Sequence, residues 1–445
     1  MIRTLVLVDG EHYPPITRDA IALARSRGHD VVGALLVGGT EKLRPGELPD
    51  LGVPVLLPAA DPATGVLAAI EDLRPDLVLD LSDEPVLGYR ERMAVAAVVL
   101  RAGVVYAGPD FRLEPPVAAP VPGGIPSVAV IGTGKRTGKT AIAGALARRA
   151  DRGGLRPVVV AMGRGGPPDP QLVEAGSVTL ARLVELARAG QHAASDYLED
   201  AVTTGVTTIG ARRAGGGLAG APYTSTVAAA VDLAVARDPG LLILEGSGAA
   251  IPPFDWGVGI LVVPATCPPE YLTGYLGPYR LLRTDLAVVT MAAGPGSGLD
   301  DLSVLTSHLR RALGDARVLV TDFTPVPLAE VVGRDAFFAT TAPGAVAARQ
   351  VQQLEATQGC RIVGWSARLA DRAGLAEDLD AAGDYDVLLT ELKAAAVDVA
   401  CERALARGAE VVFVDNRAEV VQGTIDLDTA LYEAIELAIR RGSER

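Results

Sequence analysis

The feature that most constrains this chain is a glycine-rich loop between an apolar run and a helical one. Residues 132–140 read Gly-Thr-Gly-Lys-Arg-Thr-Gly-Lys-Thr. They follow the β-branched run at 127–131 and lead into the Ala/Leu-rich segment at 141–149. A strand, a glycine loop ending in Gly-Lys-Thr and a helix are together typical of a P-loop, whose backbone amides and helix N-terminus hold phosphate groups. The pattern therefore predicts that the chain binds a nucleoside triphosphate.

The loop sequence assigns roles to individual residues. Lys139 is expected to reach the β- and γ-phosphates, and the hydroxyl of Thr140 is expected to bind Mg²⁺. A glycine usually stands five residues before Gly138, whereas this chain has Thr133 there and carries two extra cations inside the loop. Such cations suit a site at which two highly charged phosphate groups meet. The predicted nucleotide-binding residues are Gly132, Thr133, Gly134, Lys135, Arg136, Thr137, Gly138, Lys139, Thr140 and Ala141.

The chain is acidic, with a formal net charge of −13 over 445 residues. This charge repels nucleic acid, which argues against nonspecific nucleic-acid binding. It would also repel a polyphosphate, so local clusters of arginine and lysine must offset the overall field.

Apolar residues make up 49% of the chain. No run of about 18 uncharged apolar residues occurs, which argues against a membrane span.

The N-terminus and the cysteines indicate the cellular setting. The chain begins directly in a strand pattern, without the apolar core and cleavage site of a signal peptide. Cys267, Cys360 and Cys401 are isolated in the sequence, so neither a disulfide framework nor a cysteine metal cluster is implied. We therefore expect a reducing, cytoplasmic setting.

Apolar runs alternate with helical patterns along the chain, which predicts α/β domains built on parallel sheets. Residues 1–113 are expected to form an N-terminal Rossmann-like domain. Residues 114–126 are rich in proline and predict a linker. Residues 127–345 are assigned to a P-loop ATP-binding domain. Residues 346–445 form a C-terminal α/β region that could continue the same sheet.

A second motif lies at residues 241–248, where the run Leu-Leu-Ile-Leu ends in Glu245 and Gly-Ser-Gly. A strand that ends in an acid beside the P-loop would bring a carboxylate to the metal. We therefore predict that Glu245 joins Thr140 in binding Mg²⁺. The alternative is that Glu245 only caps the turn that follows.

Arginines and histidines near glycines or strand ends are the candidate substrate ligands. Arg164 lies between glycines after a predicted strand, where a guanidinium could clamp a phosphate with two hydrogen bonds. Arg212 and Arg213 precede a glycine run, and the alternative is that they form a solvated face. His192 would be either a general acid–base or only a cation at a helix end, and we favour the second. His12 follows the first predicted strand, at the sheet edge where open α/β folds bind ligands.

Base recognition has no clear signature in the sequence. The guanine-reading motif of GTPases, an Asn/Thr-Lys-x-Asp segment after a strand, does not occur. Residues 320–325, Val-Thr-Asp-Phe-Thr-Pro, are a candidate loop on the adenine side of the nucleotide.

These segments together resemble the cyclic 2,3-diphosphoglycerate synthetase family over nearly the full length of the chain. The P-loop spacing and the Glu-Gly-x-Gly strand end also resemble dethiobiotin synthetase, a P-loop ligase. Several matching strings are long and unusual, so the resemblance is more specific than a P-loop alone. These strings include residues 7–13, 80–85, 132–141, 162–167, 192–196, 245–253 and 389–400.

The resemblance implies a ligase that uses ATP and Mg²⁺ to close 2,3-bisphosphoglycerate into cyclic 2,3-diphosphoglycerate, with release of ADP and phosphate. One substrate phosphate would be activated by the γ-phosphoryl group of ATP, and the other would then displace phosphate to form an internal anhydride. Because the nucleophile is already charged, catalysis would rest on positioning and on neutralisation of charge. The resemblance implies that the transferring group is neutralised by Lys139, Lys135 and Arg136. It implies that the substrate phosphates are held by Arg164, Arg212 and Arg213.

The same resemblance implies a homodimer that acts on a small phosphorylated molecule, without nucleic acid or a membrane as partner. The chain differs from the methanogen members of the family in being rich in alanine and arginine and poor in lysine. A relative from another kind of organism could act on a related bisphosphate.

Two other functions fit parts of the sequence. A ligase of the dethiobiotin synthetase type, which activates a carboxylate or carbamate, shares the P-loop and the Glu-Gly-x-Gly strand end. It does not account for the N-terminal domain or the arginine loops. A nucleotide-switch ATPase, such as a metal-insertion chaperone or a partitioning ATPase, is the second alternative. A metal chaperone should carry His-rich or paired-Cys segments, which the sequence lacks.

Overall fold

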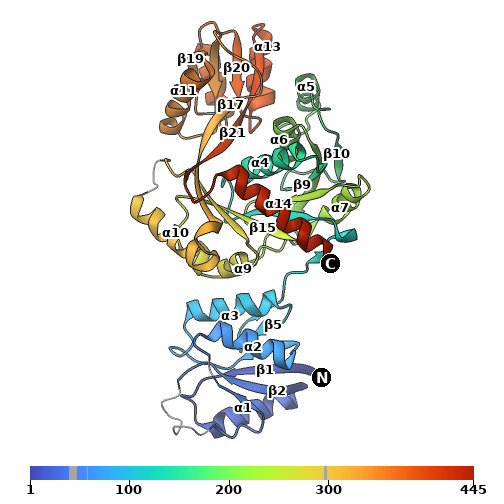
Figure 1. The fold of residues 1–445 in the computed structure, drawn as a ribbon, viewed down its shortest axis with the longest axis vertical. Coiled ribbons are helices and arrows are strands. Elements are labelled where there is room, and N and C mark those ends of the chain that lie inside the picture. The colour runs from blue at the N-terminus through green and yellow to red at the C-terminus, as the bar shows by residue number, and fades with distance from the viewer. Residues whose placement is uncertain (40–47, 58, 295–297, 445) are drawn as a thin grey trace. The chain divides into compact units, whose positions relative to one another are not determined.

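Parallel β-sheets with helices on their faces form the protein, which confirms the predicted α/β class (Figure 1). The fold is that of a computed structural model, which describes residues 1–39, 48–57, 59–294 and 298–444. Within these ranges, no helix combines the length and the apolar composition that a membrane crossing needs.

The chain divides into two units. The first unit comprises Met1–Val117 and Pro269–Arg283, and the second comprises Ala118–Pro268 and Thr284–Arg445.

The first unit contains a six-stranded sheet in the order β3-β2-β1-β4-β5-β6, and only β6 pairs antiparallel. Five consecutive residues of β1 are buried, because helices cover both faces of a parallel sheet. The strands are β1 (Ile2–Val8), β2 (His29–Leu36), β3 (Val55–Leu56), β4 (Leu77–Asp80), β5 (Val105–Ala107) and β6 (Arg112–Leu113). The helices are α1 (Pro14–Ser26), α2 (Pro62–Leu73), α3 (Tyr89–Arg101), α8 (Glu270–Thr273) and α9 (Gly277–Leu281).

The second unit is built on a 13-stranded sheet with the P-loop strand β8 (Ser127–Gly132) in its interior. All six residues of β8 are buried, and it pairs in parallel with β13 and with β15. The other strands of this part are β9 (Pro157–Gly163), β10 (Gln171–Val173), β11 (Thr207–Ala214), β12 (Thr224–Ser225), β13 (Leu241–Glu245), β15 (Val258–Pro264), β16 (Leu286–Thr290) and β17 (Val318–Pro327). The helices are α4 (Lys139–Arg152), α5 (Leu180–Arg188), α6 (Asp196–Thr204), α7 (Val227–Val235) and α10 (Leu299–Leu313), with a 3₁₀ turn at Asp315–Arg317.

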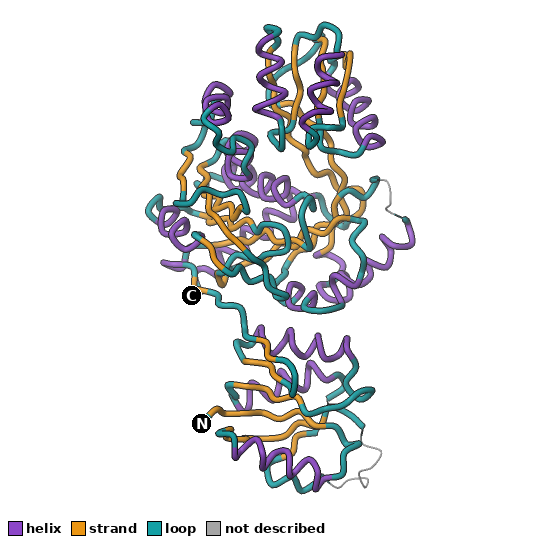
Figure 2. Tube along the Cα trace, turned by 180° about the vertical axis from the view of Figure 1, so that it is seen from behind, coloured by secondary structure: helices purple, strands orange, loops and turns teal. Residues whose placement is uncertain are grey.

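The strands of the C-terminal region join this same sheet. The long strand β21 (Glu410–Gln422) pairs antiparallel with β17 and, at its other end, parallel with β20 (Val387–Thr390). Figures 1 and 2 show β17 and β21 running together from the P-loop half of the unit into its C-terminal half. The remaining elements are β18 (Asp335–Ala339), β19 (Arg361–Ser366), α11 (Gly344–Gln358), α12 (Arg372–Ala381), a π-helix at Ala396–Cys401, α13 (Glu402–Ala406) and α14 (Leu427–Ser443).

The last helix returns to the P-loop half of the unit. Buried side chains of α14, among them Leu431 and Ile435, share one apolar core with Ile142 and Leu146 of α4. The chain therefore leaves the P-loop sheet, builds the C-terminal half and comes back to cover the helix that follows the P-loop.

The proline-rich stretch at 114–126 carries only short elements. The two-residue strand β7 (Ala119–Pro120) pairs in parallel with β14 (Phe254–Asp255), and a 3₁₀ turn follows at Pro122–Gly124. The boundary between the two units falls within this stretch, after Val117.

Candidate functional site

The P-loop joins β8 to α4 through a glycine with a left-handed backbone. Gly138, the residue before the first turn of α4, has φ 89° and ψ 16°. A Cβ at this position would lie 2.5 Å from the ring of Phe323. Glycine is therefore required here both by its φ angle and by the lack of space for a side chain.

Lys139 folds back over the loop from which it projects. Its Nζ donates to the carbonyl oxygen of Gly134 at 2.7 Å and to Oγ1 of Thr137 at 3.3 Å. Burial lowers the pKa of this lysine to about 8, although the carboxylates of Glu245 and Asp196 act in the opposite direction. The ammonium is thus held inside the loop that the sequence predicts to bind phosphates.

Thr140 and Glu245 meet beside the loop, as the strand-end position of Glu245 leads one to expect. Oγ1 of Thr140 donates to Oε1 of Glu245 at 2.8 Å. The second carboxylate oxygen of Glu245 is buried and has no hydrogen-bond partner among the described residues. Burial raises the pKa of Glu245, and nearby Asp196 raises it further. A hydroxyl next to a carboxylate is a donor set that Mg²⁺ accepts.

Asp200 of α6 lies against Glu245 and was not singled out in the sequence. Its side chain is fully buried, and neither carboxylate oxygen has a donor among the described residues. Burial raises the pKa of Asp200, and the neighbouring Glu245 carboxyl group raises it further. Two carboxyl groups in contact each disfavour the charged form of the other, and a cation bound beside them would reduce this repulsion.

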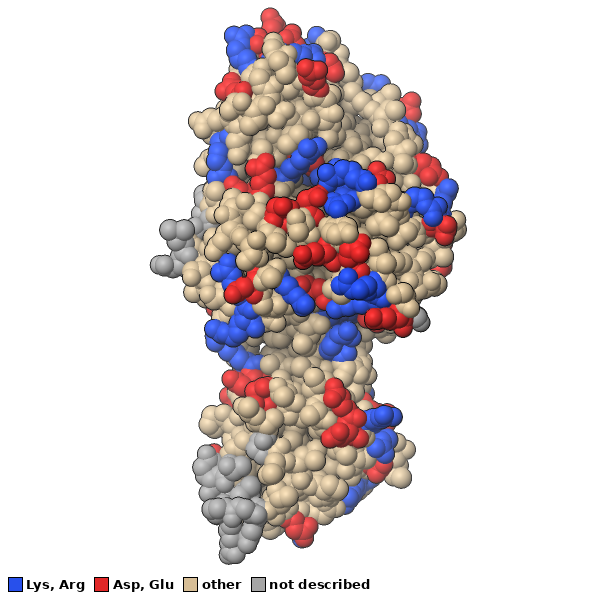
Figure 3. Space-filling view, viewed as in Figure 1, with Lys and Arg blue, Asp and Glu red and all other residues tan. Residues whose placement is uncertain are grey.

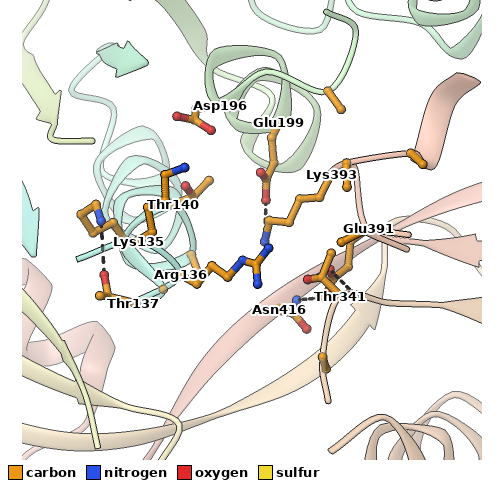
Figure 4. A pocket seen from close by; sticks show the side chains of 18 of the residues that line it. Lys135, Arg136, Thr137, Thr140, Asp196, Glu199, Thr341, Glu391, Lys393 and Asn416 are labelled. Carbon is orange, nitrogen blue, oxygen red and sulfur yellow. Dashed lines mark hydrogen bonds and ion pairs between the residues drawn. The ribbon is translucent and has the colours of Figure 1, made fainter. Parts of the chain in front are cut away.

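A cavity of about 1230 Å³ lies in the second unit in front of the P-loop (Figure 4). Drug-sized ligands occupy cavities of about 300–1,000 Å³, so this one has room for a nucleotide together with a second small molecule. Arg136 of the P-loop points into it. The lining segments are residues 135–141, 190–194, 245–248, 341–343 and 393–395, with further single residues from helices and from the ends of other strands.

The C-terminal half of the unit supplies the opposite wall of the cavity. Glu391, which follows β20, is buried and accepts hydrogen bonds from Oγ1 of Thr340, from N and Oγ1 of Thr341 and from Nδ2 of Asn416. Burial alone would raise the pKa of this carboxyl group, but nearby Lys393 and these donors outweigh it and lower the pKa. Glu391 is therefore a charged, fully paired group that fixes the wall.

The predicted arginines separate into two groups. Arg164 lines the cavity, with its guanidinium over Gly248, and Arg213 lies beside it. Arg213 donates to the carbonyl oxygens of Gly215 at 2.5 Å and Ser247 at 2.6 Å. Neither Arg212 nor Arg213 is among the lining residues, but Arg213 is buried and Arg212 is exposed, because neighbouring residues of β11 point to opposite faces. Nε of Arg212 donates instead to the carbonyl oxygen of Gly166 at 2.8 Å.

The two predicted histidines lie in different units. His192 lines the cavity and packs against Gly165. His12 belongs to the first unit, where its Nδ1 lies 2.7 Å from Oδ1 of Asp9 and its Nε2 lies 3.7 Å from Oδ2 of Asp83.

The predicted adenine-side loop also borders the cavity. Asp322 and Phe323, at the end of the parallel pairing of β17, are among the lining residues. Arg349 of α11 reaches across to this loop, donating to Oδ2 of Asp322 at 3.0 Å and to the carbonyl oxygen of Ala293 at 2.6 Å. The C-terminal half of the unit is thus tied to the strand ends of the P-loop half at this point.

Positive charge is concentrated locally and does not dominate the surface. On the face drawn in Figure 3, basic and acidic side chains are interspersed over the second unit. Inside the cavity, Lys135, Arg136, Lys139 and Arg164 lie within one continuous space, which acidic residues also line. These cations at and beside the P-loop fit the expectation that an acidic chain needs clustered cations to bind a polyphosphate.

The chain matches three protein-family models that together span nearly its whole length. They are described as the N-terminal domain, the P-loop domain and the C-terminal domain of cyclic 2,3-diphosphoglycerate synthetase, and they match residues 3–114, 127–322 and 327–417.

Curated relatives match over comparable lengths. A protein of Rubrobacter xylanophilus named cyclic 2,3-diphosphoglycerate synthetase is 48% identical over 93% of this chain and 94% of its own length. A protein of the same name from Methanothermus fervidus is 39% identical over 98% of this chain and 97% of its own length. Among solved structures, the hydrogenase maturation factor HypB of Archaeoglobus fulgidus is 18% identical, with a TM-score of 0.28 over 45% of this chain and 82% of its own.

We expect nucleotide binding to take up protons near pH 8. The pKa of Lys139 in the ligand-free protein is about 8, so a large share of these lysines is neutral there. A triphosphate beside the ammonium favours its charged form and raises this pKa, so protons are bound on association. Calorimetric titration of ATP in two buffers of different ionisation enthalpy measures the uptake, which should become small about one pH unit below the pKa. Proton release, or the same uptake in Lys139→Met, would contradict this assignment.

Proposed function

The chain belongs to the cyclic 2,3-diphosphoglycerate synthetase family, and we propose that it closes 2,3-bisphosphoglycerate into cyclic 2,3-diphosphoglycerate at the expense of ATP, releasing ADP and phosphate. This reaction needs one site that holds a nucleotide and a second polyanion together. The observation that carries the proposal is the cavity of about 1230 Å³ that joins the P-loop, Arg164 and the wall built by the C-terminal half.

The proposed chemistry has two steps. An oxygen of one substrate phosphate takes the γ-phosphoryl group of ATP, the β–γ bond breaks and ADP leaves. An oxygen of the other substrate phosphate then attacks the activated phosphorus, forms the P–O–P bond of the ring and expels inorganic phosphate. Both nucleophiles are anionic at neutral pH, so no strong base is required, and the protein contributes positioning and positive charge.

The residues around the cavity divide this work. Lys139, Lys135 and Arg136 of the P-loop would neutralise the transferring phosphoryl group, since all three line the cavity. Arg164 and Arg213 would hold a phosphate group of the substrate, since both guanidinium groups lie beside residues 247 and 248 at the cavity edge.

Thr140 and Glu245 would hold Mg²⁺. The buried carboxylate of Glu245 and the adjoining hydroxyl of Thr140 fit this ion. No group of three or more His, Cys, Asp or Glu side chains among the described residues could hold a metal by itself. Mg²⁺ in nucleotide sites usually takes one or two protein ligands, and phosphate oxygens and water complete its coordination shell. When bound, the ion would lower the charge repulsion between the phosphate groups.

The two alternative functions account for less of the molecule. A ligase that activates a carboxylate or carbamate needs no second set of phosphate-binding cations such as Arg164 and Arg213. A nucleotide switch needs no room for a second small molecule next to the P-loop.

We further propose a homodimer in the cytoplasm. The homodimer rests on the family resemblance, and the compartment rests on three buried cysteines that are isolated in the sequence.

³¹P NMR of the protein with ATP, Mg²⁺ and 2,3-bisphosphoglycerate tests the proposed function. We expect the substrate signals to fall while cyclic product, ADP and phosphate form in equal amounts. Lys139→Ala should keep its fold by circular dichroism and form no product, because the cation at the β- and γ-phosphates is lost. ATP consumption with unchanged substrate signals would instead favour a nucleotide switch.

Arg164 and Arg212 offer a matched pair of substitutions. Arg164→Met removes a guanidinium that lines the cavity and should lower kcat/KM for the bisphosphate. The expected decrease corresponds to a loss of about 2–4 kcal/mol of transition-state stabilisation. Arg212→Met removes one that does not line it, and its kinetics should stay near those of the wild type. Steady-state kinetics with the bisphosphate varied measure both effects. Equal losses in the two variants would remove Arg164 from the proposed substrate site.

A further inference from the structure

The cavity wall across from the P-loop carries Lys393, a cation that the proposed mechanism has not used (Figure 4). It lies in the turn that follows β20, two residues after Glu391. Because Glu391 is already paired with hydroxyl, amide and backbone donors, it does not need the lysine as a partner. The hydrogen bonds of Glu391 fix the turn and so fix the place from which Lys393 reaches into the cavity.

The backbone next to Lys393 is unusual. Ala394 has φ 49°, in the left-handed region that residues with a Cβ rarely adopt. A π-helix begins two residues later, at Ala396–Cys401. Strained backbone and π-helical turns are both found preferentially at functional sites, where they hold a side chain in a required position.

Lys393 is charged and only partly engaged. Its Nζ lies 3.1 Å from Oε1 of Glu199 on α6, and its side chain remains 38% exposed. Burial lowers its pKa, but Glu199 and Glu391 outweigh burial and raise the pKa, so the lysine is positive at neutral pH. An ammonium has three N–H donors, so Lys393 can bind further acceptors that enter the cavity.

One carboxylate interacts electrostatically with Lys393, with Lys139 of the P-loop and with Arg213. The carboxylate of Asp196, at the start of α6, acts on Lys139, on Arg213 and on Lys393. Asp196, Lys139 and Lys393 all line the cavity, and Arg213 lies near its edge beside Ser247. Such an arrangement suits two phosphate groups that must approach each other against their mutual repulsion.

We propose that Lys393 binds a phosphate group of the substrate and that Glu199 is only its partner before the substrate arrives. This inference rests on the proposed function and adds to it a substrate ligand from the C-terminal half of the unit. Arg164 and Arg213 would hold the bisphosphate from one side, and Lys393 from the other. The bound phosphate replaces Glu199 as the main acceptor for the ammonium.

A purely structural role makes a different prediction. If the Lys393–Glu199 pair only ties the two halves of the unit together, removing either partner should have the same effect. If Lys393 binds substrate, the two substitutions should differ. A matched control exists in Arg188, whose Nε lies 2.8 Å from Oε1 of Glu402. That pair joins α5 to α13 and does not line the cavity.

The experiment compares Lys393→Met, Glu199→Gln and Arg188→Met by steady-state kinetics. We expect Lys393→Met to raise the KM for 2,3-bisphosphoglycerate by about 10- to 100-fold, as loss of a charge-assisted hydrogen bond does, while the KM for ATP changes little. Glu199→Gln should leave the KM for the bisphosphate unchanged or lower it, because the ammonium loses a competing acceptor. Arg188→Met should match the wild type, and Lys393→Arg should recover part of the lost affinity.

Thermal unfolding supplies a readout that does not depend on turnover. 2,3-Bisphosphoglycerate should raise the Tm of the wild type and of Glu199→Gln, and should raise that of Lys393→Met much less. An equal loss of affinity in Lys393→Met and Glu199→Gln, or an unchanged affinity in Lys393→Met, would overturn the inference. Lack of cyclic product with the wild-type protein would instead count against the proposed function, and the Tm shifts would still report on the anion site.

Discussion

The hydrogen bond between Thr140 and Glu245 joins the first turn of α4 to the end of β13. It forms because β13 and β8 are parallel neighbours, with Glu245 opposite Val130 in the register. The carboxylate therefore emerges beside the loop that follows β8. The buried carboxyl group of Asp200 and the folded-back Lys139 are arranged around this contact. The rest of the cavity extends from this point toward the C-terminal half of the unit.

In the ligand-free protein, each of three cations of the site contacts an oxygen atom of the protein. Lys139 donates to the carbonyl oxygen of Gly134, Arg213 to that of Ser247, and Lys393 pairs with Glu199. Each cation is therefore held near its working position, and a phosphate oxygen can take the place of the partner with little rearrangement. The net charge of −13 repels polyanions, and these fixed cations would offset that repulsion at the proposed site.

The local features of the site were predictable from the sequence, and the long-range ones were not. The P-loop and the contact of Glu245 with Thr140 follow from the end of a buried strand, and the family prediction was confirmed by full-length relatives. Arg212 and Arg213 could not be separated by composition, although strand alternation allows only one of them to face inward. Lys393 was not singled out because its partner Glu199 lies 194 positions earlier in the chain, and the tertiary packing of Leu198 against Leu392 and Val397 brings the two segments together.

We propose above that one cavity in the second unit holds the triphosphate and a second polyanion at the same time. A crystal structure with a non-hydrolysable ATP analogue, Mg²⁺ and 2,3-bisphosphoglycerate tests it most directly. The account predicts the triphosphate on residues 132–141, with Nζ of Lys139 moved from Gly134 to a phosphate oxygen, and the bisphosphate in the same cavity between Arg164 and Lys393. A nucleotide bound elsewhere, or a bisphosphate bound only in the first unit, would contradict it.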